Sequence, residues 1–228
     1  MREEPRIQIT KDGPYLVSGK VRLSRETIIV DENGVSDTWK ETEKSETSES
    51  CALCRCGKSS NKPFCDGTHE RIDFDGTETA QNEPYERSSQ AIQGPTLVLR
   101  DKAELCIGVG FCDKNIGTWE LTERSGVPLA KEMAIQTAGN CPSGRLVCYD
   151  KETEKPIEPA CGESIALVED PQEGVSGPLW VRGKIPVESC KGKEYEPRNR
   201  VTLCRCGKSS NKPFCDGTHV TVKFSDKK

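Results

Sequence analysis

Hydrophobic and polar residues alternate over several short stretches of the chain, and this alternation predicts strands. Segments 13–20 (GPYLVSGK) and 177–184 (GPLWVRGK) share one pattern, and each predicts a strand. In the middle of the chain the pattern predicts three further strands, at 96–100, 117–122 and 146–149. Apolar residues take a helical spacing over 128–139, where Pro128 falls near the first turn. The chain is therefore expected to mix several strands with few helices.

Two long polar stretches interrupt these elements. The run TWKETEKSETSES (38–50) is acidic and rich in Ser and Thr, and it predicts a solvated loop. The stretch 76–94 is polar and rich in turn residues, and it predicts a linker. The expected units follow from these breaks: a first unit at 1–80, a linker at 81–94, a middle domain at 95–152 and a second unit at 153–228.

Composition narrows the classes of protein that fit. Of 228 residues 33% are hydrophobic and 31% are charged, which argues against a large apolar core. The net charge of -4 offers no basic excess for a polyanion, so we expect no nucleic-acid partner. No apolar run approaches the ~18–20 residues of a membrane helix, and the N-terminus lacks a secretory pattern. We therefore expect a cytoplasmic protein in a reducing environment, without a membrane partner.

Cysteine usage and a repeat dominate the rest of the sequence. The chain has 13 cysteines, an odd number, so disulfides within one chain cannot pair them all. Residues 53–69 (LCRCGKSSNKPFCDGTH) recur letter for letter at 203–219, and Phe74 and Phe224 each follow five residues after the last histidine. An identical stretch rich in thiols favours a role for them as ligands of a metal or a cluster.

Each copy holds three cysteines and one histidine in the spacing C-x-C-x8-C-x3-H. A lone histidine is more often an ordinary core or surface residue, but this chain has only two histidines and both close this pattern. Three thiolates and one imidazole suit zinc or an iron–sulfur cluster. The candidate ligands are Cys54, Cys56, Cys65 and His69 in the first copy and Cys204, Cys206, Cys215 and His219 in the second.

The residues between these candidate ligands are typical of a tight loop. Gly57 and Gly67 permit a positive φ, and Pro63 fixes φ just before a cysteine. Asp66 is placed to accept hydrogen bonds from the backbone N–H groups that follow it. Such bonds would direct His69 inward, and they are equally compatible with an ordinary turn.

The motif CRCGKS…PFCDGTH (54–59 and 63–69) resembles the CDGSH, or mitoNEET-type, iron–sulfur motif, with Thr68 where the eponymous members have Ser. The resemblance implies iron bound through three Cys and one His in each copy, and therefore two [2Fe–2S] clusters. It also implies a β-cap above small cluster lobes, in which the two motifs of one chain mimic a homodimer about a pseudo-two-fold axis. Zinc remains the alternative metal.

Three cysteines of the middle segment form a second pattern: Cys106, Cys112 and Cys141, the last followed by Pro142. A Cys-Pro pair after a helix is typical of bacterial ferredoxins. The segment resembles single-cluster ferredoxins, which fold as a small α/β sandwich, but Val109 stands where four-cysteine members have a ligand. Three-cysteine relatives carry [3Fe–4S]; a [4Fe–4S] cluster with another fourth ligand, or a domain with buried free thiols, are the alternatives.

The order of CDGSH, ferredoxin-like and CDGSH segments resembles a bacterial arrangement of these modules. The expected fold class is therefore α+β: two small β-rich CDGSH units, forming a pseudo-two-fold β-cap with cluster lobes, and an inserted ferredoxin-like α/β sandwich.

The remaining cysteines and the cations of the motif loops have plainer interpretations. Cys148 lies in a strand pattern and predicts a small buried side chain, whereas Cys161 and Cys190 predict loop thiols. Cys51 has no counterpart in the second copy and is not expected to bind metal; Cys161 is a remote alternative as a fourth ligand. The motif cations either offset cluster charge and meet an acidic partner or are ordinary exposed groups: Arg55, Lys58, Arg205 and Lys208.

These patterns favour electron transfer as the function. Both histidines are committed to the motifs, and the chain has no phosphate-binding loop or dinucleotide fingerprint, so we expect no enzyme. The alternatives are an iron–sulfur cluster store or donor, a redox or pH sensor with labile His-ligated clusters, and a zinc-stapled structural module. Expected partners are redox proteins or apo-acceptors of clusters, and the chain is expected to be a monomer with an internal pseudo-dimer or a homodimer.

Overall fold

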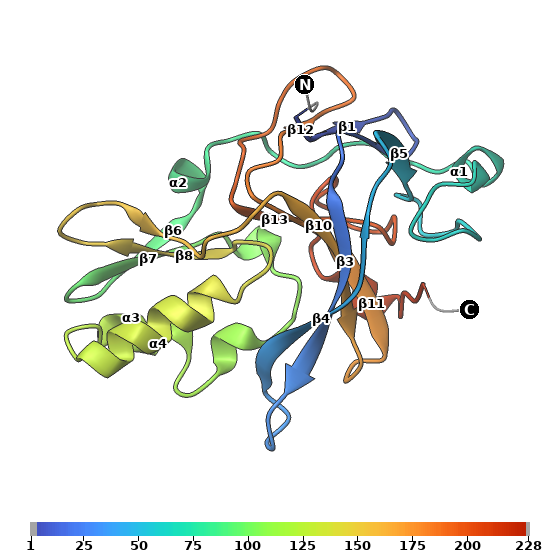
Figure 1. Cartoon of the computed structure of the whole chain (residues 1–228). Coiled ribbons are helices and arrows are strands. Elements are labelled where there is room, and N and C mark those ends of the chain that lie inside the picture. Colours follow the sequence, from blue (N-terminus) through green and yellow to red (C-terminus); the bar gives the residue numbers. More distant parts are fainter. Residues whose placement is uncertain (1–3, 227–228) are drawn as a thin grey trace.

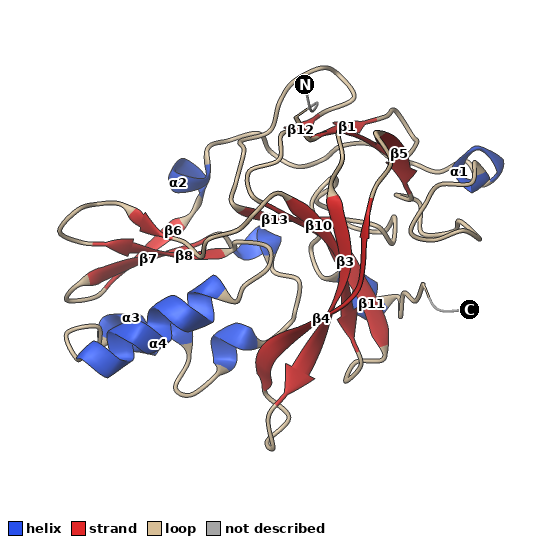
Figure 2. Cartoon of the chain, in the orientation of Figure 1, coloured by secondary structure: helices blue, strands red, loops and turns tan. Residues whose placement is uncertain are grey.

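Three β-sheets organise the chain in its computed structural model, which describes residues 4–226 (Figures 1 and 2). Strands outnumber helices, as the alternating pattern predicts, and the fold is mixed α/β. The first sheet has the order β12 (Val187–Glu188), β1 (Arg6–Ile9), β2 (Tyr15–Ser18) and β5 (Ser50–Leu53). The second has the order β13 (Arg200–Leu203), β11 (Val175–Arg182), β10 (Ser164–Asp170), β3 (Arg22–Val30) and β4 (Ser36–Glu46).

The first and last parts of the chain exchange strands between these two sheets. In the first part β2 pairs with β5, and in the last part β11 pairs with β13, both antiparallel. The strands between the members of each pair cross to the other sheet: β3 and β4 join the second sheet, where β3 lies parallel to β10, and β12 joins the first, where it lies parallel to β1. The two parts are therefore interlocked like the subunits of a dimer, within one chain.

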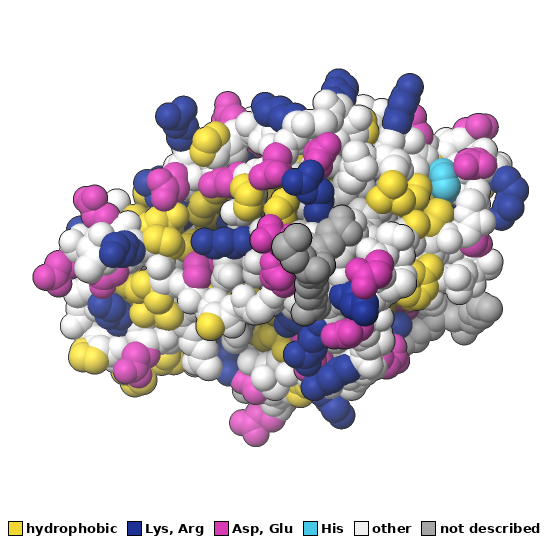
Figure 3. Space-filling model, turned by 45° about the horizontal axis from the view of Figure 1, so that its top comes forward, with side chains coloured by type: hydrophobic (Ala, Val, Ile, Leu, Met, Phe, Trp, Pro, Cys, Tyr) yellow, Lys and Arg dark blue, Asp and Glu magenta, His cyan; other side chains and the backbone are white. Residues whose placement is uncertain are grey.

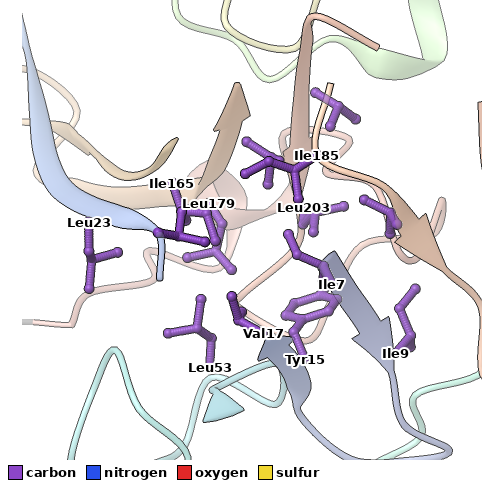
Figure 4. Packing of buried hydrophobic residues seen from close by; sticks show 14 of the residues in the cluster. Ile7, Ile9, Tyr15, Val17, Leu23, Leu53, Ile165, Leu179, Ile185 and Leu203 are labelled. Carbon is purple, nitrogen blue, oxygen red and sulfur yellow. The ribbon is translucent and has the colours of Figure 1, made fainter. Parts of the chain in front are cut away.

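The exchanged strands bury one shared hydrophobic core, which is close to solvent-free (Figure 4). Ile7, Tyr15 and Leu53 come from the first sheet, and Ile165 and Leu203 come from the second. The alternation predicted at 13–20 and 177–184 is confirmed as β2 and β11, and the inward-facing residues of both strands enter this core. Burial of side chains from both parts is the main force that holds the units together.

The middle segment forms the third sheet, with two helices packed on it (Figure 2). Antiparallel strands follow the order β6 (Gln90–Gln93), β7 (Leu97–Asp101), β8 (Leu146–Asp150) and β9 (Pro156–Ile157). Its helical elements are α2 (Tyr85–Ser88), α3 (Thr118–Glu123), α4 (Pro128–Gly139) and 3₁₀ turns at Ala103–Leu105 and Phe111–Asp113. The predicted strands at 96–100 and 146–149 and the predicted helix at 128–139 are confirmed.

The prediction of a strand at 117–122 is wrong, because this segment forms helix α3. Its buried residues are Thr118, Leu121 and Thr122, whose spacing of three and four is helical rather than alternating. The Thr118 hydroxyl lies 2.8 Å from that of Thr137 in α4, which fixes the two helices against each other. Residues 117–122 include only two apolar side chains, which are too few to distinguish a helical period from an alternating one.

The solvated loop predicted at 38–50 is also wrong, because most of it forms the edge strand β4. Polar side chains are tolerated there because β4 is exposed on much of its surface. Trp39 is the exception: its ring stacks on Phe111 at 4.8 Å and lies 5.0 Å from Trp180. The β3–β4 hairpin thereby joins the second sheet to the middle segment.

None of the helices within residues 4–226 combines the length and the apolar character that crossing a membrane requires.

A buried arginine fastens the middle segment to the second sheet. Arg200 on β13 is 1% exposed and donates to the carbonyls of Ala138, Gly139 and Cys141 at 2.7–2.8 Å. It also pairs with Glu158 at 2.7 Å. The end of α4 and the backbone at Cys141 are therefore held by a residue from the C-terminal unit.

Replacing Arg200 with Met is expected to destabilise the protein by about 3–5 kcal/mol, because it leaves buried carbonyls and a carboxylate without their partner. Urea unfolding measures the change. The matched control is Arg6→Met, which removes the exposed Arg6–Glu188 pair between β1 and β12 and is expected to cost less than about 1 kcal/mol. Equal effects of the two substitutions would contradict a fastening role for Arg200.

Candidate metal centres

Each repeated motif forms a loop that leaves a strand and ends in a single helical turn. The first runs from β5 to α1 (Thr68–Arg71), and the second runs from β13 to α5 (Thr218–Thr221). In both loops the cysteine after the strand donates its N–H to a proline carbonyl at 2.8 Å. Identical sequences therefore close identical turns, and the side chains of the candidate ligands point inward on each loop.

The candidate ligands lie in two pairs on each loop. The sulfurs of Cys54 and Cys56 are 3.8 Å apart, and Cys65 Sγ lies 3.3 Å from His69 Nδ1. The second loop repeats this arrangement, with 3.6 Å between the sulfurs of the Cys204–Cys206 pair and 3.3 Å from Cys215 Sγ to His219 Nδ1. Two sulfurs at ~2.3 Å from one tetrahedral metal lie about 3.8 Å apart, so each pair fits one metal.

Within residues 4–226, no three side chains of His, Cys, Asp or Glu converge as ligands of a single ion. The donor set of each loop consequently suits two metals, each held by one pair, better than one. Hydrogen bonding between the paired sulfurs lowers the pKa of Cys54 and of Cys204 and raises the pKa of Cys56 and of Cys206, so one sulfur of each pair is the readier thiolate. The residues present therefore fit a binuclear cluster.

The turn role expected for Asp66 is confirmed, and Asp216 repeats it. Asp66 accepts hydrogen bonds from the N–H of Ser60 at 2.8 Å and from that of Thr68 at 3.0 Å. The hydroxyls of Thr68 and Ser60, followed by these backbone bonds, hold the pKa of Asp66 well below the usual range. In the second loop Thr218 and Ser210 together hold the pKa of Asp216 at about 2, although burial opposes ionisation there. Both carboxylates are thus ionised, and their hydrogen bonds hold the backbone that positions the last Cys and His of each motif.

The two loops meet back to back at their glycines. Gly57 has φ +74°, and a Cβ placed on it would lie 2.6 Å from the carbonyl oxygen of Cys206. Gly207 has φ +77°, and a Cβ placed on it would lie 2.7 Å from the carbonyl oxygen of Cys56. Only glycine permits this approach. The Cys54–Cys56 and Cys204–Cys206 pairs are therefore close neighbours across the pseudo-two-fold axis.

The motif arginines are buried, whereas the motif lysines are exposed. Arg55 is 1% exposed and lies over the ring of Phe74, and Arg205 is 3% exposed and lies over Phe224. The interpretation of these arginines as exposed cations is therefore wrong, since backbone carbonyls outside the loops, such as those of Gly13 and Gly177, bind their guanidinium groups. Lys58 and Lys208 are exposed, which is compatible with an ordinary surface cation and with contact to an acidic partner.

The three middle cysteines approach one another without converging on one ion. Burial, followed by the charges of Asp113, Cys141 and Cys106, raises the pKa of the Cys112 thiol to about 12. Cys112 therefore lies within electrostatic reach of both other cysteines.

The other cysteines have the plainer roles that the sequence predicts, although Cys148 packs in the same buried cluster as Cys141 and Cys112. Cys148 is fully buried in β8 as predicted, and Cys51 packs beside the shared core from β5. Cys161 lines a surface hollow together with Arg22, Glu26 and Arg182. Cys190 is exposed in a turn, as predicted.

The two histidines differ in exposure although their loops are identical. Fifteen per cent of the His69 side chain is exposed, and its Nε2 lies 3.7 Å from the Glu70 carboxylate; the face in Figure 3 shows histidine surface (cyan) beside acidic groups (magenta). His219 is 3% exposed. Burial, with a smaller contribution from Arg205, lowers the pKa of His219 to about 4. The first loop opens to water, and the second does not.

The middle segment covers the second loop. Cys215 belongs to a buried cluster with Ile107, Val109 and Phe111, which stand between the first two middle cysteines. A Cβ on Gly217 would lie 3.3 Å from the carbonyl oxygen of Cys106. The cysteine turn of the middle segment and the second motif are therefore in direct contact.

Sequence reasoning missed the residues that surround the loops. The Tyr15 hydroxyl crosses from the first sheet and donates to the carbonyl of Cys204 at 2.7 Å. Glu169 and Asp226 lie against Arg205. The only available signal was the position of Tyr15 in the repeated strand, where the second copy has Leu179.

Comparison with known families agrees with this arrangement. A family model described as iron-binding zinc finger, CDGSH type, matches residues 12–70 and 176–220, and a model described as divergent 4Fe-4S mono-cluster matches residues 92–151 between them. The chain is a CDGSH iron–sulfur protein. Its two CDGSH units flank a divergent single-cluster ferredoxin-like domain, as the sequence predicts. No curated protein and no solved structure matches this CDGSH protein significantly.

Replacing Gly57 with Ala is expected to lower the iron content of both loops, because the new Cβ would collide with the backbone of Cys206. Iron per chain after anaerobic purification measures the loss. Gly67→Ala is the matched control: its φ of +80° imposes similar backbone strain, but no atom lies within 4 Å of its Cβ position. We expect Gly67→Ala to keep most of its iron, and equal iron loss in the two variants would contradict the close contact.

Proposed function

We propose that this CDGSH protein is an electron-transfer protein. It would carry two [2Fe–2S] clusters, each held by three Cys and one His, and one [3Fe–4S] or [4Fe–4S] cluster in the middle segment. The observation that carries the proposal is the division of each motif's donors into two pairs at single-metal distances. Bound iron–sulfur clusters supply one-electron redox chemistry.

The paired donors support a [2Fe–2S] cluster in each motif. Cys54 and Cys56 would hold one iron, and Cys65 and His69 the other, through Nδ1 of the imidazole. A mononuclear zinc site would instead require all four donors at mutual distances close to those of the pairs. The ionised Asp66 braces the second pair from outside, in the manner of the outer residues that orient metal ligands.

The middle segment supports a third cluster on a ferredoxin-like fold. Cys106, Cys112 and Cys141 would be its ligands, with Val109 buried where a fourth cysteine would stand. Arg145 interacts with Cys106 and is fixed by Asp101 at 2.6 Å. A cation held beside a thiolate lowers the cost of the cluster's negative charge.

The proposed exchange involves one electron at a time. A one-electron donor protein is oxidised as this chain is reduced, and an oxidised partner then takes the electron from the chain. Imidazole in place of thiolate makes a site less negative, so His69 and His219 are expected to raise the potentials above those of all-cysteine ferredoxins. The expected donor and acceptor are therefore proteins rather than small molecules.

Three further features accompany the proposal. We expect no catalytic activity of its own, because both histidines of the chain are used by the motifs. We propose a reducing cytoplasm, since all thirteen cysteines are unpaired. The internal exchange of strands favours a monomer that already contains the pseudo-dimer.

Iron and sulfide analysis of anaerobically purified protein tests the cluster content, together with EPR spectra before and after dithionite. Three clusters predict about seven or eight Fe per chain, and two [2Fe–2S] clusters alone predict about four. An as-isolated signal near g of about 2.01 would identify [3Fe–4S] in the middle segment. A colourless, zinc-loaded protein from iron-replete anaerobic expression would contradict the proposal.

The exposure of His69 favours a second candidate function, in which the first site donates its cluster to an apo-acceptor. Water and protons reach His69, whereas His219 is covered. His69→Cys is therefore expected to slow cluster loss at pH about 5.5 severalfold, and the matched His219→Cys variant is expected to change it little. Visible absorbance at this pH follows the loss. Transfer to apo-ferredoxin at physiological rates would favour donation; equal effects of the two variants would contradict a labile first site.

A further inference from the structure

The two seventeen-residue loops are identical, so any difference between their sites comes from the surroundings. We propose that these surroundings hold the His69 site at a higher reduction potential than the His219 site, making it the exit for electrons. This inference rests on the proposed electron-transfer function. The two sites differ in the charge around their buried arginines, in exposure to water and in their contacts with the middle segment.

The charge of Arg205 is balanced by buried carboxylates. Arg205 lies 3.3 Å from Glu169 and forms an ion pair with Asp226, and both carboxylate side chains are at most 4% exposed. Arg25 pairs with the same two acids and also, at its outer side, with the exposed Glu43. Two cations therefore face two buried anions, and little net positive charge remains beside the second site.

The negative charge of Asp226 is permanent at neutral pH. Burial opposes its ionisation, but Arg205 and Arg25 outweigh burial and hold its pKa at about 2. The Ser176 hydroxyl adds a hydrogen bond at 3.0 Å. Asp226 therefore cancels part of the field of Arg205 under all conditions in which the protein works.

The charge of Arg55 has no such balance. Its guanidinium donates to three backbone carbonyls, those of Gly13 at 2.8 Å, Gly76 at 2.9 Å and Thr10 at 3.0 Å. Within residues 4–226 it forms no ion pair. Carbonyl dipoles satisfy its donors but leave its unit charge in place, beside the Cys54–Cys56 pair.

Four carboxylates line the hollow at the first site, of which Asp12 is half-buried and the other three are exposed and screened by water: Asp12, Glu70, Asp73 and Asp75. Asp12 accepts the N–H of Gly76 at 2.9 Å and lines an open hollow of about 550 Å³ with His69. Glu70, beside His69, is 80% exposed in its side chain. Screened charges act weakly, whereas buried ones act strongly, so Arg55 dominates the local field.

The difference in exposure to water shifts the reduction potentials of the two sites in the same direction as the difference in charge. Reduction adds an electron to a cluster that is already negative, so both a nearby uncompensated cation and contact with water favour the reduced form. The first site has both, through Arg55 and the partly exposed His69. The second site has neither, because its arginine is neutralised and the Ile107–Phe111 turn covers it.

The contacts set an order for electron movement. The turn that carries Cys106 lies on Gly217, and the two motif loops touch through Gly57 and Gly207. The open hollow at His69 lies at the other end of this series. An electron from a reduced one-electron donor would pass from the middle segment through the His219 site to the His69 site. A one-electron acceptor protein would there be reduced as the chain is oxidised.

Potentiometric titration of the holoprotein, followed by EPR and visible absorbance, tests this inference. We expect two separate [2Fe–2S] transitions whose equilibrium constants for reduction differ at least tenfold, which is about 59 mV for one electron. His69→Cys is expected to lower only the upper transition, and His219→Cys only the lower, which assigns them. Asp226→Asn is expected to raise the equilibrium constant for reduction at the lower transition at least threefold.

The matched control is Glu43→Gln, which removes the exposed partner of Arg25 and is expected to leave both transitions in place. Glu169→Gln repeats the Asp226 test from the other partner of Arg205, should Asp226→Asn fail to fold. A single potential for both sites, or a shift of the upper transition by Asp226→Asn, would overturn the inference. A protein without reducible clusters would instead contradict the proposed function itself.

Discussion

The contact between the two motif loops at Gly57 and Gly207 is the constraint on which the rest of the structure depends. Two backbones can approach this closely only where neither residue has a side chain. The approach requires the strands that lead into the loops to come from two interlocked sheets, and the exchange of β3 and β12 provides that frame. The arrangement of the sites relative to one another is therefore a property of the whole chain.

The inserted segments break the symmetry that this frame would otherwise impose. Trp39 of the β3–β4 hairpin stacks on Phe111, and Arg200 donates hydrogen bonds to carbonyls at the end of α4. Both contacts draw the middle segment against the second unit. One of two identical loops is thereby covered, and the other faces water. The difference between them originates in packing against the insertion and in a few charged residues outside the motifs.

The sequence predicted those parts of the molecule that short-range chemistry determines. The repeated strands, the helix at 128–139, the brace at Asp66 and the grouping of donors by motif all follow from spacing or turn chemistry. Strand β4, which covers most of 38–50, and helix α3 were missed because tertiary contacts, through Trp39 and Thr118, decide their conformation. The burial of Arg55 and Arg205 was missed for a related reason: their partners are backbone carbonyls and distant carboxylates, which leave no pattern near the motif.

The exchange of strands also has a consequence for biosynthesis. When the first eighty residues have been made, the first sheet still lacks β12, and β3 has no neighbour in the place of β10. The turn at Gly57 lacks the backbone against which it packs until Cys206 has been synthesised. Neither motif can thus reach its final shape until both have been synthesised, and delivery of iron and sulfide to the first motif must wait for the second.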